Sequence, residues 1–134
     1  MKKYLLDSHV LLWSVFEVNK IPKQVQDVLK NSENAIFVSS VSLWEISLKY
    51  RLGKLDFFNF DPMNLPLICG QMQYELLPLE PIEASSYHLL QANYHKDPFD
   101  RMLIRQAIQQ GLILLSADAL VAQYTVEGLK VFWQ

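Results

Sequence analysis

The sequence predicts an α/β fold, a three-layer sandwich in which helices cover both faces of a parallel sheet of four to five strands. Short apolar runs recur along the chain and alternate with segments of helical periodicity, a pattern typical of strands buried on both faces. The chain has 134 residues, of which 51% are hydrophobic, so it can fill one core. The sequence has no internal repeats, linkers or low-complexity tracts, and we therefore expect residues 1–134 to form a single domain.

The first half of the chain predicts two strands and three helices. Residues 4–6 predict the first strand, and the apolar positions from Val10 to Phe16 share one face of a helix. Pro22 suits the first turn of a second helix, which stops at the polar residues 31–34. Residues 35–38 predict the second strand. The third helix has three N-cap candidates and ends at a glycine: Ser39, Ser40, Ser42 and Gly53.

The second half predicts the remaining strands. Two prolines and three phenylalanines in residues 56–66 are typical of a loop, which leads to a helix before the third strand at residues 74–79. Helices are expected at residues 82–92 and 99–109, with Gly111 as the C-cap of the latter. The last expected elements are a fourth strand at 112–115, a short helix at 119–124 and a fifth strand at 131–133.

Composition restricts the setting in which the protein works. The formal net charge of −2 gives no general basic field, so a nucleic-acid partner has to be attracted locally or through bound cations. The single cysteine, Cys69, favours a reducing compartment, and we interpret its side chain as a core hydrophobe rather than a catalytic thiol. Asp7 interrupts the apolar N-terminal stretch, and no apolar run reaches the roughly 18 residues of a membrane span. We therefore expect a soluble, cytoplasmic protein.

Two aspartates follow expected strands. Asp7 ends the first apolar run, and Asp118 lies three residues beyond the fourth strand. In an open parallel sheet the carboxyl ends of the strands face one crevice. Both side chains are therefore expected to lie there.

Two further acids have competing interpretations. Glu45 lies early in the helix after the second strand, which brings it toward the same edge, but it also follows Ser42 at the spacing of a capping box. Asp97 is well explained as the N-cap before Pro98. Asp100 fits a helix-start role less well, because aspartate is a mediocre helix former. Glu45 and Asp100 therefore each keep a structural and a chemical interpretation.

Several carboxylates at one crevice would repel each other and raise each other's pKa unless a cation lay among them. Magnesium and manganese prefer oxygen ligands and keep bound waters, which leaves room for a phosphate and a hydrolytic water. Such a site needs no serine or cysteine nucleophile. The residues alone therefore predict an acidic metal pocket.

Four phrases resemble, in this order, the motifs of the PIN-domain family: LLDSHVLLW at 5–13, SSVSLWEISLKYRLGKL at 39–55, HKDPFDRMLIRQA at 95–107 and LLSAD at 114–118. More narrowly, they resemble the VapC-like toxin ribonucleases of type II toxin–antitoxin systems, over nearly the whole chain. The resemblance implies a PIN-like fold and a metal-dependent endoribonuclease that hydrolyses RNA phosphodiesters. It also implies one or two Mg²⁺ or Mn²⁺ ions, a homodimer, and an antitoxin whose tail blocks the site.

The resemblance also assigns residues. Asp97 would be an accessory carboxylate or a structural cap, and we favour the cap. Ser8 and Ser116 stand where relatives usually carry threonine, and each keeps a hydroxyl that can orient a carboxylate or a metal-bound water. The implied catalytic and metal-binding residues are Asp7, Glu45, Asp100 and Asp118.

Basic residues near these acids offer a local rim for RNA phosphates. Lys49 and Arg51 follow Glu45, although Glu45 and Lys49 also have the i, i+4 spacing of an ordinary surface pair. Lys54 lies a few residues further on. We interpret Arg101 as a partner of neighbouring carboxylates. The three histidines lack a zinc-like spacing and are interpreted as non-ligands: His9, His88 and His95.

Four large apolar side chains are candidates for contact with a protein partner. Trp13, Phe16, Trp44 and Leu48 fall on two helices and offer an apolar groove for an antitoxin. The same positions also suit the core. We favour the core interpretation.

Two other classes of protein compete with this interpretation. A phosphoryl-accepting or phosphatase domain also places an aspartate after its first strand, but it requires a second acid two residues on or a late lysine. Here Ser8 and His9 follow Asp7, and Ser116 follows the fourth strand. The other class is a non-catalytic RNA- or partner-binding module of the same fold. Loss of one acid would favour that module, and all four are present.

Overall fold

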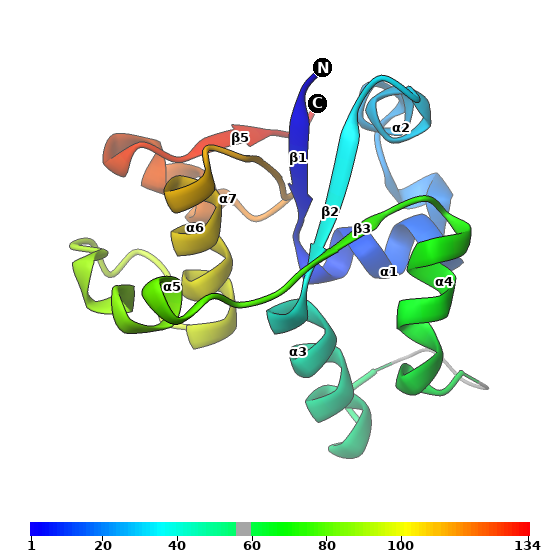
Figure 1. Cartoon of the computed structure of the whole chain (residues 1–134), viewed down its shortest axis with the longest axis horizontal. Coiled ribbons are helices and arrows are strands. Elements are labelled where there is room, and N and C mark those ends of the chain that lie inside the picture. The colour runs from blue at the N-terminus through cyan, green and yellow to red at the C-terminus, as the bar shows by residue number, and fades with distance from the viewer. Residues whose placement is uncertain (56–59) are drawn as a thin grey trace.

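Figure 1 shows the computed structural model, which describes residues 1–55 and 60–134. Part of the expected loop, residues 56–59, lies outside the described residues. The strands are β1 (Lys3–Leu6), β2 (Ala35–Ser39), β3 (Glu75–Leu77), β4 (Ile113–Leu115) and β5 (Lys130–Phe132). The α-helices are α1 (Ser8–Phe16), α2 (Lys23–Lys30), α3 (Ser40–Arg51), α4 (Leu65–Gln71), α5 (Pro81–Ser85), α6 (Pro98–Gln110) and α7 (Ala119–Ala122). Short 3₁₀ turns lie at Val18–Lys20, Pro62–Asn64, Tyr87–Leu89 and Gln123–Glu127.

The five strands form one sheet in the order β3-β2-β1-β4-β5. Every neighbouring pair is parallel, and in the centre Leu5 of β1 lies opposite Phe37 of β2 and Leu114 of β4. The predicted α/β sandwich is confirmed, with the fifth strand included. Because all strands run the same way, their carboxyl ends lie at one edge of the sheet.

Helices cover both faces of this sheet (Figure 1). Successive side chains of a strand point to opposite faces, and β1 shows the division. Leu6 packs in a core with residues of α1, α2 and α4, whereas Leu5 packs in a second core with residues of α6 and α7. Both leucines are fully buried, as is Cys69 of α4, which lies in the first core as predicted.

Helix starts bring polar side chains to the carboxyl edge. Asp97 is the N-cap of α6 with Pro98 next to it, as predicted, and Gly111 ends this helix in the left-handed conformation at φ 66°. In each of four helices the N-cap side chain accepts a hydrogen bond from a backbone N–H of the first turn, and these residues are Asp7, Ser39, Asp97 and Asp118. Two of the acids singled out from the sequence, Asp7 and Asp118, therefore also start helices.

The helix expected at residues 82–92 is wrong in its second half. The chain leaves the helix after α5, makes the short 3₁₀ turn and then runs without regular structure. The carbonyl oxygens of Leu90 and Ala92 accept hydrogen bonds from Arg101. The N–H of Ala92 donates to Glu127. Hydrogen bonds to side chains that are distant in sequence thus replace the backbone hydrogen bonds of a helix. The hydrophobic periodicity of the sequence does not reveal these bonds.

The expected loop at residues 56–66 also ends earlier than predicted. Asp61 accepts a hydrogen bond from the N–H of Met63, which starts the 3₁₀ turn at Pro62. This turn leads directly into α4, whose first residue is Leu65. Proline suits the first turn of a helix because its missing N–H is not needed there. The prolines therefore mark a helix start rather than a loop.

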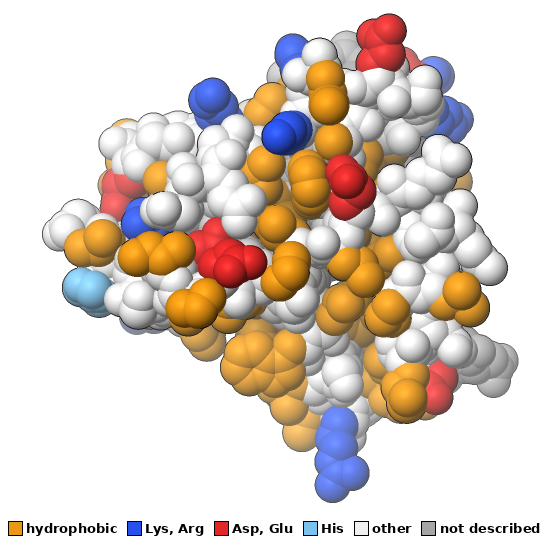
Figure 2. All heavy atoms as spheres, in the orientation of Figure 1, with side chains coloured by type: hydrophobic (Ala, Val, Ile, Leu, Met, Phe, Trp, Pro, Cys, Tyr) orange, Lys and Arg blue, Asp and Glu red, His pale blue; other side chains and the backbone are white. Residues whose placement is uncertain are grey.

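The core interpretation of the four large apolar residues is wrong for Phe16 and Leu48, and most clearly for Trp44. Its side chain is 62% exposed, and it contacts the ring of Phe99 on α6 at 4.9 Å between centroids. Phe16 and Leu48 are each 39% exposed, while Trp13 packs against the first core. Figure 2 shows hydrophobic side chains gathered on this face over α3. A separate finding is that no helix among the described residues has the length and apolar character of a membrane span.

Candidate metal centre

A pocket of about 390 Å³ opens at the carboxyl edge of the sheet, and all four acids singled out from the sequence line it. They come from four separate places in the chain: Asp7 between β1 and α1, Glu45 in α3, Asp100 in the first turn of α6, and Asp118 at the start of α7. Residues far apart in sequence therefore meet in one place, as the topology of a parallel sheet requires.

Asp7 is buried, with 2% of its surface exposed, and both of its carboxylate oxygens are held. Its Oδ1 accepts the N–H of Ser8 at 2.8 Å, and its Oδ2 accepts the hydroxyl of Ser116 at 2.7 Å. The Ser116 hydroxyl in turn accepts the N–H of Asp118 at 3.1 Å. One serine therefore links the two aspartates that follow β1 and β4, and it orients Asp7 as the sequence interpretation allowed.

Glu45 is buried in α3 and points into the pocket. Its Oε1 accepts the hydroxyl of Ser8, and its Oε2 accepts Nζ of Lys49, both at 2.6 Å. The capping-box interpretation is wrong, because the N-cap of α3 is Ser39. The hydroxyl of Ser42 is buried and has no hydrogen-bond partner among the described residues.

We expect Ser42→Ala to leave the free energy of unfolding unchanged or to raise it by about 0.5–1 kcal/mol, because an unpaired buried hydroxyl costs stability. Ser39→Ala is the matched change, and it should lower that free energy by about 1 kcal/mol because it removes the helix cap. Urea unfolding of the two variants checks this. A loss of stability in Ser42→Ala as large as in Ser39→Ala would restore the capping-box interpretation.

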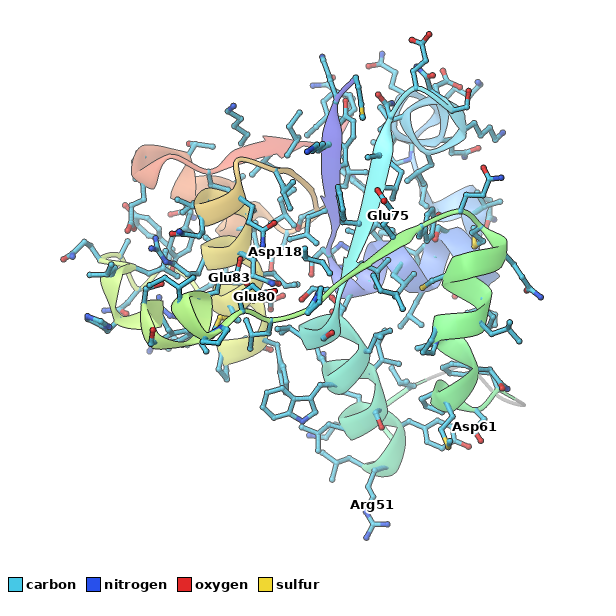
Figure 3. All side chains as sticks on the ribbon, viewed as in Figure 1. Arg51, Asp61, Glu75, Glu80, Glu83 and Asp118 are labelled. Carbon is cyan, nitrogen blue, oxygen red and sulfur yellow. The ribbon has the colours of Figure 1, made fainter. Side chains whose placement is uncertain are left out.

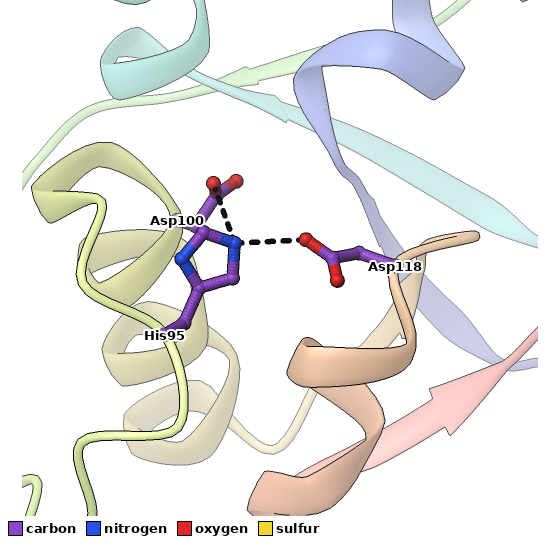
Figure 4. A group of neighbouring side chains, drawn as sticks. All are labelled: His95, Asp100 and Asp118. Atoms are coloured by element: carbon purple, nitrogen blue, oxygen red, sulfur yellow. Dashed lines mark hydrogen bonds and ion pairs between the residues drawn. The ribbon is translucent and has the colours of Figure 1, made fainter.

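Asp100 and Asp118 meet across a histidine (Figure 4). Nε2 of His95 lies 2.8 Å from Oδ2 of Asp118 and 3.1 Å from Oδ2 of Asp100. One atom from each of these three residues lies within 4.8 Å of the others, close enough to hold a metal ion. His9 is a second histidine at the pocket, with Nδ1 3.5 Å from Oδ2 of Asp7. The sequence spacing of the histidines from one another gives no sign of either contact, because in each case the partner is a carboxylate.

The pocket carries more negative charge than its basic residues balance. Burial and the charges of four neighbouring carboxylates together raise the pKa of Asp100 to about 8, with burial the largest cause; the carboxylates are those of Asp7, Glu45, Asp97 and Asp118. Burial lowers the pKa of Lys49, but the carboxylates of Glu45, Asp97 and Asp100 together outweigh burial and raise the pKa above its ordinary value. Lys49 therefore stays charged and neutralises one acid, which leaves the rest of the cluster in need of a cation.

The side chains present fit a hard divalent ion. Carboxylate oxygens are the ligands that Mg²⁺ and Mn²⁺ prefer, and four carboxylates from four separate places in the chain line this pocket. A divalent cation among them would relieve the repulsion that keeps a proton on Asp100.

The other predicted site residues differ in whether they line the pocket. Lys49 and Lys54 line the pocket. Arg51 does not line it and projects from the end of α3, away from the body of the protein (Figure 3). Asp97 also stays outside the lining, and its Oδ1 caps α6 by accepting the N–H of Phe99 at 2.8 Å. The structural role that we favoured for Asp97 thus accounts for its position.

The prediction that Arg101 pairs with carboxylates is wrong. Its guanidinium is buried and donates to uncharged oxygens: the hydroxyls of Tyr87 and Tyr124, and the carbonyls of Leu90, Ala92 and His95. These bonds fasten the irregular segment that carries His95 against α6. The signal for this role lay in a contact between distant segments, which sequence spacing does not reveal.

The sequence of residues 4–126 matches the family model of the PIN domain. The chain belongs to the PIN domain family. A search of curated proteins finds no match. The predicted family is thereby confirmed.

Solved structures share the fold of this PIN domain at low sequence identity. A chain of VapBC2 from Rickettsia felis, bound to a DNA fragment from its promoter, has a TM-score of 0.66 and 16% identity, covering 98% of this chain and 99% of that one. FitAcB from Neisseria gonorrhoeae has a TM-score of 0.60 and 16% identity, covering 96% of each chain. PAE2754 from Pyrobaculum aerophilum has a TM-score of 0.58 and 14% identity, covering 97% and 89%. At these identities the comparison establishes the fold.

Proposed function

We propose that this PIN domain is a metal-dependent endoribonuclease and the toxin of a type II toxin–antitoxin pair. PIN domains are generally nucleases. The observation that carries the proposal is the meeting of Asp7, Glu45, Asp100 and Asp118 in one pocket, with the pKa of Asp100 raised to about 8. All four acids are present, and the pKa of one of them is strongly raised. Both features favour a catalytic site over a non-catalytic binding module.

In this proposal the four carboxylates hold one or two Mg²⁺ or Mn²⁺ ions. When bound, such ions lower the pKa of a water and stabilise the charge that develops on a phosphodiester. Ser8 and Ser116 keep Glu45 and Asp7 pointing into the pocket through bonds of 2.6 and 2.7 Å. Rigid placement of these side chains reduces the cost of ordering the site when substrate binds.

Two lysines at the pocket supply positive charge for the RNA backbone. Lys49 is tied to Glu45, so its ammonium is fixed at the pocket wall, and Lys54 lines the same wall. An RNA phosphate that enters the pocket would meet both charges, although the whole chain carries a net charge of −2. Local attraction therefore replaces the general basic field that the protein lacks. We propose Lys49 and Lys54, in place of the expected Lys49 and Arg51, as the phosphate-binding rim.

The test of this function is cleavage of single-stranded RNA by the purified protein. We expect cleavage in the presence of Mg²⁺ or Mn²⁺, complete loss in excess EDTA, and recovery when the metal ion is restored. Circular dichroism in EDTA checks that the protein remains folded. Cleavage that persists in EDTA would contradict the metal-dependent mechanism.

The variant Asp118→Asn tests the contribution of a single carboxylate to RNA cleavage. Asparagine is as good an N-cap as aspartate, so α7 should keep its start. The substitution removes one negative charge from the pocket, and we expect the rate of cleavage to fall about 100-fold or more. Full cleavage by a folded Asp118→Asn protein would remove Asp118 from the proposed ligand set.

We also propose an antitoxin partner and a homodimer, both implied by the resemblance to VapC-like toxins. Supporting this, Trp44 is 62% exposed and lines an apolar pocket of about 220 Å³ between α3 and α6, together with Phe99 and Met102. Exposed apolar patches of this kind are typical of protein interfaces. Size-exclusion chromatography with light scattering, on the protein alone and coexpressed with its antitoxin, tests both partners.

A further inference from the structure

His95 lies between two of the proposed metal ligands, and both nitrogens of its ring are engaged. Nε2 faces the carboxylates of Asp118 and Asp100 at 2.8 and 3.1 Å. Nδ1 accepts a hydrogen bond from the backbone N–H of Asp97 at 3.2 Å. The side chain is 13% exposed, so protein groups rather than water define its surroundings.

The contact with the Asp97 amide fixes which nitrogen carries the ring proton. A nitrogen that accepts an N–H must present a lone pair, so Nδ1 is unprotonated. Nε2 is then the nitrogen that carries the N–H, which points at the two carboxylates. A histidine that binds a metal ion through Nε2 needs the opposite arrangement, with Nδ1 donating its proton to a carbonyl or carboxylate.

We propose that His95 is a positioning residue, whose Nε2–H holds Asp100 and Asp118 toward the pocket, and that it does not coordinate the ion. The inference rests on the proposed function for the identity of the ligands. It leaves an all-oxygen donor set, which favours Mg²⁺ or Mn²⁺ over the softer zinc ion.

The surroundings of His95 keep the ring in this place. Its backbone N–H donates to the hydroxyl of Tyr124 at 3.2 Å, and its carbonyl accepts from Arg101 at 3.4 Å. Tyr124 and Arg101 are both buried, and they bond to each other at 2.9 Å. His9 shows a similar arrangement at the pocket with its two nitrogens exchanged: Nε2 accepts the N–H of Ala117 at 3.2 Å, and Nδ1 faces Asp7.

The test is the tautomer of His95, measured by long-range ¹H–¹⁵N correlation on ¹⁵N-labelled protein, with and without Mg²⁺. We expect the Nε2–H form in both samples, with Nδ1 in the range of an unprotonated acceptor. An Nδ1–H form, or a change to Nδ1–H when Mg²⁺ is added, would overturn the proposal. His95→Asn identifies the resonances.

Two substitutions extend the test to metal affinity, measured by calorimetric titration with Mg²⁺. Glutamine can place an N–H where Nε2 lies, so His95→Gln should bind Mg²⁺ within about threefold of the unmodified protein, whereas the shorter His95→Asn should bind about tenfold more weakly. His88→Asn, on the exposed 3₁₀ turn, is the control and should bind normally. Equal losses in His95→Gln and His95→Asn would show that the imidazole itself is a ligand.

Failure of this proposal and failure of the proposed function can be told apart. The spectrum of the metal-free protein does not depend on RNA cleavage. An Nε2–H ring in a protein that cuts no RNA would reject the nuclease function and keep the role of His95 as a holder of the two carboxylates. Metal-dependent cleavage by a protein with an Nδ1–H ring would do the reverse.

Discussion

Asp7→Asn is expected to reduce the rate of RNA cleavage by about 1,000-fold or more while the protein remains folded. Among the neighbouring charges that raise the pKa of Asp100, that of Asp7 has the largest effect, and its two oxygens are fixed by Ser8 and Ser116. Asparagine keeps the shape of the side chain and can still accept the Ser8 N–H. The loss of activity should therefore report the missing charge at the metal site rather than a change of fold.

A matched control for this substitution is Asp27→Asn. Asp27 lies on α2 in an exposed ion pair with Lys23, far in the chain from the pocket residues, and it does not line the pocket. We expect Asp27→Asn to cleave RNA at the normal rate. The measurement compares the RNA cleavage rates of Asp7→Asn, Asp27→Asn and the unmodified protein, and circular dichroism checks that each protein is folded. Normal cleavage by Asp7→Asn would contradict the proposed mechanism.

Asp100→Asn is expected to abolish cleavage and also to stabilise the metal-free protein at alkaline pH. The pKa of Asp100 is about 8 in the folded protein, above its ordinary value of 3.8. The folded state therefore holds the proton more tightly than the unfolded state. The stability that results is fully present below pH 3.8 and is lost as the pH rises toward 8, by up to ~1.4 kcal/mol per pH unit.

Thermal unfolding in EDTA at several pH values measures this effect. The Tm of the unmodified protein should fall between pH 5 and 8, and that of Asp100→Asn should fall less, so that at pH 8 the variant has the higher Tm by about 5 °C or more. Adding Mg²⁺ should raise the Tm of the unmodified protein most at pH 8, because Asp100 must lose its proton to bind the ion. If the Tm of both proteins fell equally with rising pH, the raised pKa of Asp100 would not be the cause of the loss of stability.

Fold geometry allowed part of the site to be predicted from sequence. Asp7 and Asp118 directly follow strands of a parallel sheet, so the topology that buries Leu5 and Leu6 also brings these two acids together. Glu45 could not be decided in this way, because its spacing from Ser42 fits a capping box equally well. The structure excludes the capping box, because Ser39 is the N-cap of α3, and it places Glu45 in the lining of the pocket.

Contacts between distant segments explain what the sequence could not reveal. Arg101 satisfies the carbonyls of the segment after α5, so residues 90–92 need no helical hydrogen bonds. The same segment delivers His95 to Asp100 and Asp118. Spacing along the chain carries no trace of either contact. The exposure of Trp44 was missed for a related reason, because periodicity identifies an apolar face without showing whether another helix covers it.

We propose that four carboxylates from four separate places in the chain form one cation site. Calorimetric titration of Mn²⁺ into the unmodified protein and into Asp7→Asn, Glu45→Gln, Asp100→Asn and Asp118→Asn tests it most directly. We predict that the unmodified protein binds Mn²⁺ and that each substitution weakens binding about tenfold or more. Normal affinity in Glu45→Gln or Asp100→Asn, the two acids for which a helix-start role was the alternative, would contradict the claim.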